Sequence, residues 1–299
     1  MNRRLRVAVT IAVVVLVITL GGWFLVSSLR SPSPEDAALA YLRALEDGDP
    51  QAVKATGAEV PASALAALDG ATARIEHPAV TAVQGTGEAR RVEVSFRLDG
   101  EEHDAELSVS AVDGRWVVDS SWLGALEPKT TIGTAVTIGE AALPGGEQTA
   151  LLPGRYRVAA APVALLDGTA DAVVLPGETT TVELQTVLRP DAVKAAQRQL
   201  DEHLETCTAP APSPPPGCGI RLPWGVDFRA VTEIRYRIDQ QPTVSLTPPG
   251  FHAAGGVLVA TVTGTGQDGA PRTTTYRSDD WSLRGDVEFT AEGLRLTAW

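Results

Sequence analysis

The sequence predicts an α+β protein in which one transmembrane helix precedes three extracellular domains. Three observations lead to this prediction. Residues 7–29 carry no charged side chain, residues 34–118 change from a helical to an alternating apolar period, and short alternating segments between turn residues dominate the remainder. The expected domains are a cone-like domain of helices and a curved antiparallel sheet at 30–126, a small β-sandwich at 127–189, and a β-rich domain with one helix at 190–299.

The uncharged segment at residues 7–29 is long enough to span a membrane. As a helix it would extend about 34 Å, and a hydrocarbon core is about 30 Å thick. Three arginines lie in residues 1–6, so we expect this tail in the cytoplasm and the chain beyond Arg30 outside the cell. A cleaved signal peptide is the alternative, but the segment is longer than the usual apolar region of roughly 7 to 15 residues. We therefore expect a single-pass cell-membrane protein whose residues 7–29 contact the lipid bilayer.

The chain beyond the predicted span is strongly acidic. Residues 31–299 hold 21 basic and 37 acidic side chains, a net charge of 21 − 37 = −16. Binding to nucleic acid depends on basic side chains that displace counterions, so nucleic acid is excluded as a partner. The charge either repels polyanionic wall polymers or keeps an exported protein soluble, and we favour the second interpretation.

The first outer domain is expected to begin with three helices. Ser33 and Asp36 have the spacing of a capping box, and Gly48 is a typical helix end. The apolar period predicts that Ala38, Tyr41, Leu42 and Leu45 face the core. Two shorter helices are expected within residues 49–57 and 61–70.

Alternating strands follow these helices. Asp99-Gly100 and Asp113-Gly114 are strong signals for two-residue hairpin turns, because both residues accept positive φ. The alternation predicts a set of inward-facing side chains: Val92, Val94, Phe96, Leu98, Leu107, Val109, Trp116 and Val118.

Residues 33–122 resemble the cone-shaped nuclear transport factor two-like domains. The resemblance rests on Pro-Glu-Asp-Ala-Ala-Leu-Ala-Tyr-Leu-Arg-Ala-Leu-Glu-Asp-Gly-Asp at the start and Asp-Gly-Arg-Trp-Val-Val-Asp at the end. It implies a curved sheet packed on helices, and some relatives are isomerases or dehydratases with an acid, histidine or tyrosine inside the cone. Here the inward positions offer no acid or base, and His77 and His103 lie beside a proline and near a hairpin turn. We therefore expect no catalytic or cofactor-binding residue.

Residues 127–189 contain three Leu-Pro-Gly tripeptides. Each predicts a type II turn, with positive φ at Gly145, Gly154 and Gly177. Tyr156 with Val158, and Val182 with Leu184, alternate with polar residues as in half-buried strands. Leu-Leu-Pro-Gly-Arg-Tyr-Arg-Val is similar to a turn and strand of bacterial surface sandwich modules in which Pro-Gly-x-Tyr recurs.

Residues 190–299 begin with a helix that is expected to bury Val193, Ala196, Leu200 and Leu204. Cys207 and Cys218 are the only cysteines, and outside the cell they should form a disulfide. A metal site with His203 is the alternative, but a fourth ligand is missing, so we expect no metal. Trp224, Trp281 and Trp299 are expected in packing roles, with a sugar-stacking platform as the alternative.

The segments around the two cysteines resemble the extracellular part of the teicoplanin-resistance-associated membrane proteins and their actinobacterial relatives. The resemblance rests on Leu-Asp-Glu-His-Leu-Glu-Thr-Cys207, Pro-Pro-Pro-Gly-Cys218, residues 231–238 and Gln-Pro-Thr-Val244. It implies one membrane span followed by small outer domains. The zinc ribbon that precedes the span in that family is absent here, since only six residues precede residue 7 and none is a cysteine.

These features favour a non-enzymatic interaction or scaffold module of the bacterial cell envelope. Its expected partners are cell-wall material or another membrane protein. A ligand-binding sensor that uses the cone as its pocket is the first alternative, and a cone-type isomerase or hydrolase is the second.

Overall fold

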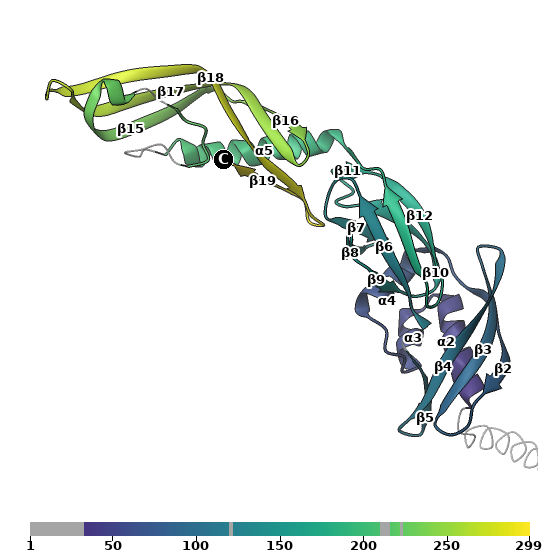
Figure 1. Cartoon of the computed structure of the whole chain (residues 1–299). Helices are drawn as coiled ribbons and strands as arrows, with labels where there is room; N and C mark the ends of the chain where they lie inside the picture. Colours follow the sequence, from purple (N-terminus) through teal and green to yellow (C-terminus); the bar gives the residue numbers. More distant parts are fainter. Residues whose placement is uncertain (1–32, 120–121, 210–215, 222–223) are drawn as a thin grey trace, which may run out of the picture. The chain divides into compact units, whose positions relative to one another are not determined.

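The computed structural model describes residues 33–119, 122–209, 216–221 and 224–299, and the predicted anchor at 7–29 lies outside them. In these ranges no helix combines the length and apolar character that crossing a membrane requires. The described chain is mixed α and β with strands predominating, as predicted (Figure 1). It divides into two units, of which the first holds the described residues up to Val60 together with Arg74–Leu123, and the second holds Pro61–Ala73 and Gly124–Trp299.

The first unit starts with helices whose ends are set by local side-chain contacts. α2 (Pro34–Asp47) begins at Ser33, whose hydroxyl accepts from the Asp36 N–H at 3.1 Å while the Asp36 carboxylate accepts from the Ser33 N–H at 3.0 Å. The helix ends at Gly48, which has a φ of 65°. α3 (Pro50–Ala55) is capped by the Asp49 carboxylate. The predicted cap and stop residues are confirmed because they act within one turn of the chain.

Four antiparallel strands complete the first unit, and α2 packs against them (Figure 1). In sheet order they are β2 (Glu76–Gln84), β3 (Ala89–Leu98), β4 (Glu101–Val112) and β5 (Arg115–Val118). Both hairpin turns have positive φ at each central residue, at Asp99-Gly100 and Asp113-Gly114. The hairpin prediction is therefore confirmed.

An aromatic cluster fills the interior between α2 and this sheet. The Trp122 ring contacts Tyr41 and Phe96 edge-on, with centroid distances of 5.8 and 5.7 Å, and all three side chains are buried. Seven of the eight predicted inward residues are also buried. The prediction for Trp116 is wrong: it is half-buried, and the Arg90 guanidinium lies 5.4 Å from its ring centroid. Trp116 lies on the edge strand two residues after the hairpin turn, where only one strand flanks it.

The boundary between the units differs from the expected division at residue 126. α4 (Ala62–Asp69) contacts two strands of the second unit, β8 (Ala141–Pro144) and β9 (Thr149–Leu151). β1 (Ala71–Ala73) pairs with β10 (Gly154–Ala160). These partners lie about 80 residues downstream, so the local pattern of residues 61–73 did not reveal them.

Short strands, all of them after residue 123 except β1, form three small sheets. The longest path runs β1-β10-β7-β8 with β12 also beside β10, the second is β13-β6-β9, and the third pairs β11 with β14. β6 and β13 are parallel, while the other pairs are antiparallel. Their bounds are β6 Gly124–Thr130, β7 Ala135–Ile138, β8 Ala141–Pro144, β9 Thr149–Leu151, β10 Gly154–Ala160, β11 Leu166–Asp167, β12 Thr169–Val174, β13 Thr179–Leu184 and β14 Val187–Leu188.

Only one of the three predicted type II turns has positive φ at the expected glycine. Gly177 has a φ of 71°, and the Glu178 N–H donates to the Leu175 carbonyl. At the first site positive φ falls on Gly146 instead of Gly145. At the second, Gly154 is the first residue of β10.

At the second site the backbone is held by a hydrogen bond from Tyr156 in place of a type II turn. The Tyr156 side chain is fully buried, and its hydroxyl donates to the Leu152 carbonyl at 2.7 Å. A tyrosine that bonds to backbone four residues upstream is the tyrosine-corner arrangement of β-sandwich domains. The motif Pro-Gly-x-Tyr thus leads directly into a strand.

The C-terminal part of the second unit is one helix against a long antiparallel sheet (Figure 1). α5 (Pro190–Cys207) contacts β16 and β19, and the sheet order is β15-β17-β18-β19 with β16 beside β17. The bounds are β15 Phe228–Gln240, β16 Thr243–Thr247, β17 Gly250–Gly266, β18 Pro271–Phe289 and β19 Leu294–Ala298, and a 3-10 turn, η2, covers Trp224–Val226.

The buried face of α5 differs from the expectation at one position. Ala196, Leu200 and Leu204 are buried as predicted, but Val193 is 38% exposed and Ala192 takes its place. Residues 192, 196, 200 and 204 follow an unbroken i, i+4 spacing, which keeps them on one stripe.

Candidate functional site

The predicted disulfide between Cys207 and Cys218 is present, and both residues are buried. Their Cα atoms are 5.7 Å apart. Cys207 is the last residue of α5, and Cys218 precedes the segment that leads to β15. The disulfide therefore ties the helix end to the start of the sheet.

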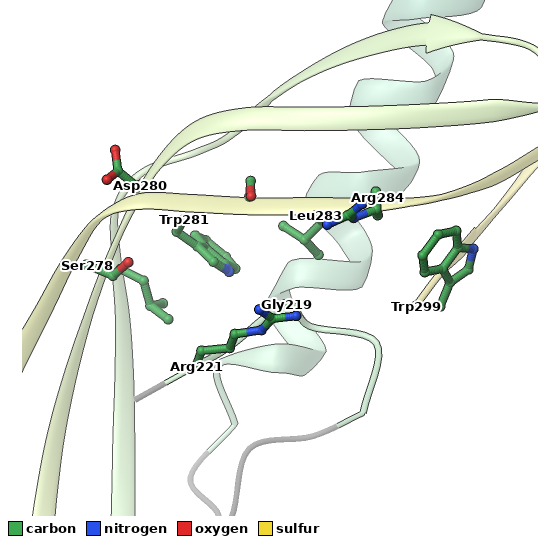
Figure 2. Close-up of a pocket in the computed structure, with 10 residues that line it drawn as sticks. Gly219, Arg221, Ser278, Asp280, Trp281, Leu283, Arg284 and Trp299 are labelled. Carbon is green, nitrogen blue, oxygen red and sulfur yellow. The ribbon is translucent and has the colours of Figure 1, made fainter. Parts of the chain in front are cut away.

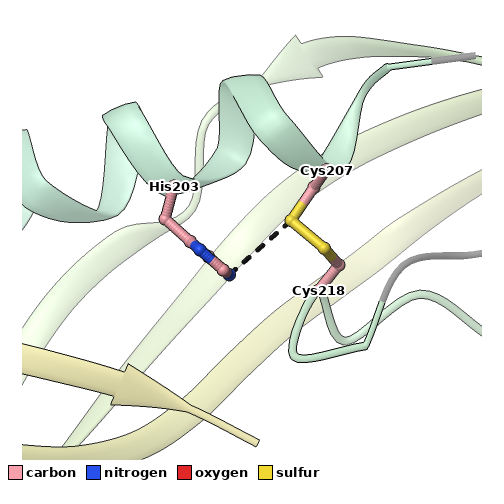
Figure 3. A group of neighbouring side chains, drawn as sticks. All are labelled: His203, Cys207 and Cys218. Atoms are coloured by element: carbon pink, nitrogen blue, oxygen red, sulfur yellow. Dashed lines mark hydrogen bonds between the residues drawn. A yellow bond between two sulfur atoms is a disulfide. The ribbon is translucent and has the colours of Figure 1, made fainter.

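His203 lies one helical turn before Cys207 (Figure 3). Its Nε2 atom is 3.0 Å from the Gly217 carbonyl oxygen and 3.7 Å from the Cys207 sulfur. The imidazole and the two sulfurs lie within 4.8 Å of one another, which is close enough for three metal ligands. Cysteine binds zinc as a free thiolate, however, and these two sulfurs are bonded to each other. In its oxidised state the cluster acts as a covalent clamp with a histidine beside it.

The segment after the disulfide is held against β18. The Trp281 indole N–H donates to the Cys218 carbonyl at 3.0 Å. Gly219 follows with a φ of 60°, and a Cβ at this position would lie 2.5 Å from the Ser282 carbonyl oxygen. A residue with a Cβ could not come this close to β18, so glycine allows the backbone at Cys218 and Gly219 to pack directly against this strand.

A cavity of about 240 Å³ lies beside this contact (Figure 2). Gly219 and Arg221 form one wall and β18 forms another, with Trp299 at the far side. The side chains with polar or aromatic chemistry are Arg221, Ser278, Asp280, Trp281, Arg284 and Trp299.

Two arginines of this cavity lack a carboxylate partner in the described part of the chain. Neither Arg221 nor Arg284 has an ion pair there. The Arg284 guanidinium instead lies 5.9 Å from the Trp299 ring centroid, a cation–π distance. Other arginines of the same sheet are paired with acids: Arg235, Arg237, Arg272, Arg277 and Arg295.

The three tryptophans do not form a common platform. Trp281 is 3% exposed and belongs to the core, as expected for a packing role. Trp224 packs against the same core and is not part of the cavity wall. Trp299, at 66% exposure, is the one with an open ring. Sequence reasoning missed the cavity because its walls come from residues about 60 to 80 positions apart.

The comparisons with known proteins assign no family. No family model matches the chain, and the comparison with curated proteins gives no match. The site is therefore interpreted from its own chemistry.

The two histidines of the first unit make different contacts. His77 is exposed, and its backbone N–H donates to the Glu46 carboxylate at 2.9 Å. The His103 ring is stacked on Phe96 with centroids 5.6 Å apart. Phe96 is the hydrophobic neighbour of this ring, so His103 has a packing role.

A second cavity, of about 350 Å³, lies in the first unit. Its walls come from the segment after α3, including Gly57 and Glu59, and from the β4–β5 hairpin, including Val112 and Val117. It lies next to the edge strand. The aromatic cluster of Tyr41, Phe96 and Trp122 occupies the core instead.

Proposed function

We propose that this chain is a single-pass, membrane-anchored protein of the bacterial cell envelope whose extracellular domains act as a non-enzymatic binding module. The observation that carries the proposal is the disulfide between Cys207 and Cys218, because disulfides form and persist mainly in oxidising compartments. The uncharged segment at 7–29, with its preceding arginines, supports an anchor with the tail inside and the domains outside.

The cavity beside Cys218 supports a binding role. It combines open cationic groups with an exposed indole, which are groups that recognise a ligand. The acidic charge of the chain disfavours nucleic acid. The partner we propose is cell-wall material or another membrane protein. The resemblance to the extracellular part of teicoplanin-resistance-associated proteins supports the same arrangement.

Cross-linking in intact membranes tests the proposal. Cells that express the full chain with a C-terminal tag are treated with a membrane-impermeant cross-linker, and the tagged protein is recovered after detergent extraction. We expect digestion of the outer domains by external protease, no free thiol before reduction, and reproducible capture of wall fragments or a membrane protein. Free cysteines together with protection from external protease would overturn the proposal.

A ligand-binding sensor remains the second candidate function because of the cavity in the first unit. In that case a small molecule should co-purify with the full chain, and Val117→Trp should displace it. The matched control is Val163→Trp, which changes an exposed valine outside this cavity.

A further inference from the structure

We propose that the cavity beside Cys218 binds a sugar that carries a carboxylate group. The inference rests on the proposed function, since it names the chemical class of envelope material that the C-terminal domain would meet.

The first argument is the local charge. The chain is acidic overall, and five arginines of the C-terminal sheet are neutralised by neighbouring acids. Arg221 and Arg284 line one cavity without such a partner in the described residues, while Asp280 is the one acid of the wall. The cavity therefore holds two guanidinium groups that no described acidic side chain pairs with. The planar fork of arginine matches a carboxylate through two parallel hydrogen bonds.

The second argument is the combination of an aromatic ring with polar groups. Trp299 is 66% exposed, and the Arg284 guanidinium lies over its ring, 5.9 Å from the centroid. A pyranose that packs its apolar face on the indole would hold an acidic substituent close to that cation. Asp280 and Ser278 can exchange hydrogen bonds with its hydroxyl groups. The volume of about 240 Å³ suits a single sugar, since sites for drug-sized ligands begin at roughly 300 Å³.

The third argument is that the backbone of the walls is held in place. The disulfide, the Trp281 to Cys218 hydrogen bond and Gly219 hold the backbone that leads to Arg221. On the other side the backbone N–H of Trp299 donates to the Arg284 carbonyl at 3.1 Å. A preformed site loses little conformational entropy when the ligand binds.

Calorimetry with two matched sugars tests the inference. The full chain in lipid nanodiscs is titrated with N-acetylmuramic acid, which carries a carboxylate, and with N-acetylglucosamine, which has the same ring without it. We expect binding of the acid at least tenfold tighter than binding of the neutral sugar. Arg221→Gln and Arg284→Gln should each weaken binding of the acid about tenfold and leave the neutral sugar unchanged.

Arg229→Gln is the matched control. Arg229 is exposed on the same sheet, has no ion pair among the described residues and is not part of the cavity wall. Its change should leave both affinities as in the wild type. Trp299→Ala should weaken both sugars, because it removes the shared stacking surface.

Two outcomes would overturn the inference. Equal affinity for both sugars, unchanged in the two arginine variants, would show that the carboxylate is not recognised. Absence of binding to either sugar, while cross-linking still captures an envelope partner, would reject this ligand class and leave the proposed function standing. Free cysteines together with protection from external protease, in the cross-linking experiment, would reject the proposed function as well.

Discussion

The Trp281 indole N–H donates to the Cys218 carbonyl oxygen at 3.0 Å, so the disulfide and the longest strand of the sheet hold each other in place. Trp281 also packs in the core formed by α5 and the sheet. The buried indole thus has both a packing and a hydrogen-bonding role, and the segment between the disulfide and Arg221 is positioned by it.

Removal of the disulfide should destabilise the C-terminal part of the second unit. Cys207→Ser with Cys218→Ser opens a loop with a sequence separation of 11, for which chain entropy gives about 2 to 3 kcal/mol. The measurement is urea unfolding of the full chain, followed by hydrogen exchange on β17 and β18 peptides. Wild type in dithiothreitol should behave like the double variant, and a double variant as stable as the oxidised wild type would contradict the prediction.

The hydroxyl of Tyr156 should contribute to stability, in contrast to that of Tyr236. Tyr156→Phe leaves the buried Leu152 carbonyl without its donor and should cost about 1 to 2 kcal/mol. Tyr236→Phe is the matched control, because its buried hydroxyl has no hydrogen-bond partner among the described residues, and its removal should be neutral or slightly stabilising. Denaturant unfolding of both variants gives the comparison. Equal losses would show that the Leu152 contact contributes nothing specific.

Truncation of Trp122 should damage the first unit far more than truncation of Trp116. Trp122 is buried between Tyr41 and Phe96, so Trp122→Ala should cost about 3 to 5 kcal/mol through loss of packing. Trp116 is half-buried on an edge strand, and Trp116→Ala should cost about 1 kcal/mol. Hydrogen exchange in urea, measured on β3 and β4 peptides, separates the two variants. Similar protection in both would contradict the assignment of the core.

The carboxylate of Asp171 should titrate below its ordinary range. Its hydrogen bonds with Arg157 and then with Arg155, at 3.2 and 3.1 Å, lower the pKa of Asp171 from 3.8. Because the folded-state pKa is the lower one, the stabilising effect exists above the unfolded pKa and is lost as the pH falls through the folded pKa. Carboxyl NMR titration should give a midpoint below 3.8, and Asp171→Asn should reduce the acid dependence of stability. A midpoint at or above 3.8 would contradict the two contacts.

Features that depend on neighbouring residues were predicted well. The capping box of Ser33 and Asp36, the stop at Gly48 and the two Asp-Gly hairpins are set by backbone and side-chain contacts within about four positions. The disulfide also followed from composition, since Cys207 and Cys218 are the only cysteines of the sequence.

Features that depend on distant partners were not predictable from the local pattern. The turn expected at Gly154 does not form, and the Tyr156 hydroxyl instead bonds to the Leu152 carbonyl. Trp116 alternates in step with the buried residues of its strand, but it lies on an edge strand and is only half-buried. The cavity forms where the backbone around Arg221 lies beside β18 and Trp299, which are distant from it in sequence. The sequence does place a glycine, Gly219, directly after Cys218, and the structure shows that a Cβ there would collide with β18.

The chain passes from one unit to the other three times, after Val60, after Ala73 and after Leu123. Residues 61–73 supply β1, in which Ala71 pairs with Tyr156, although the residues on both sides of this segment belong to the first unit. A fragment that stops at residue 126 would lack the strands that α4 and β1 contact. A fragment that starts there would lack β1, so part of one edge of β10 would be unpaired. A cut at residue 126 therefore separates elements that pair with one another, and the two units should be expressed as one chain.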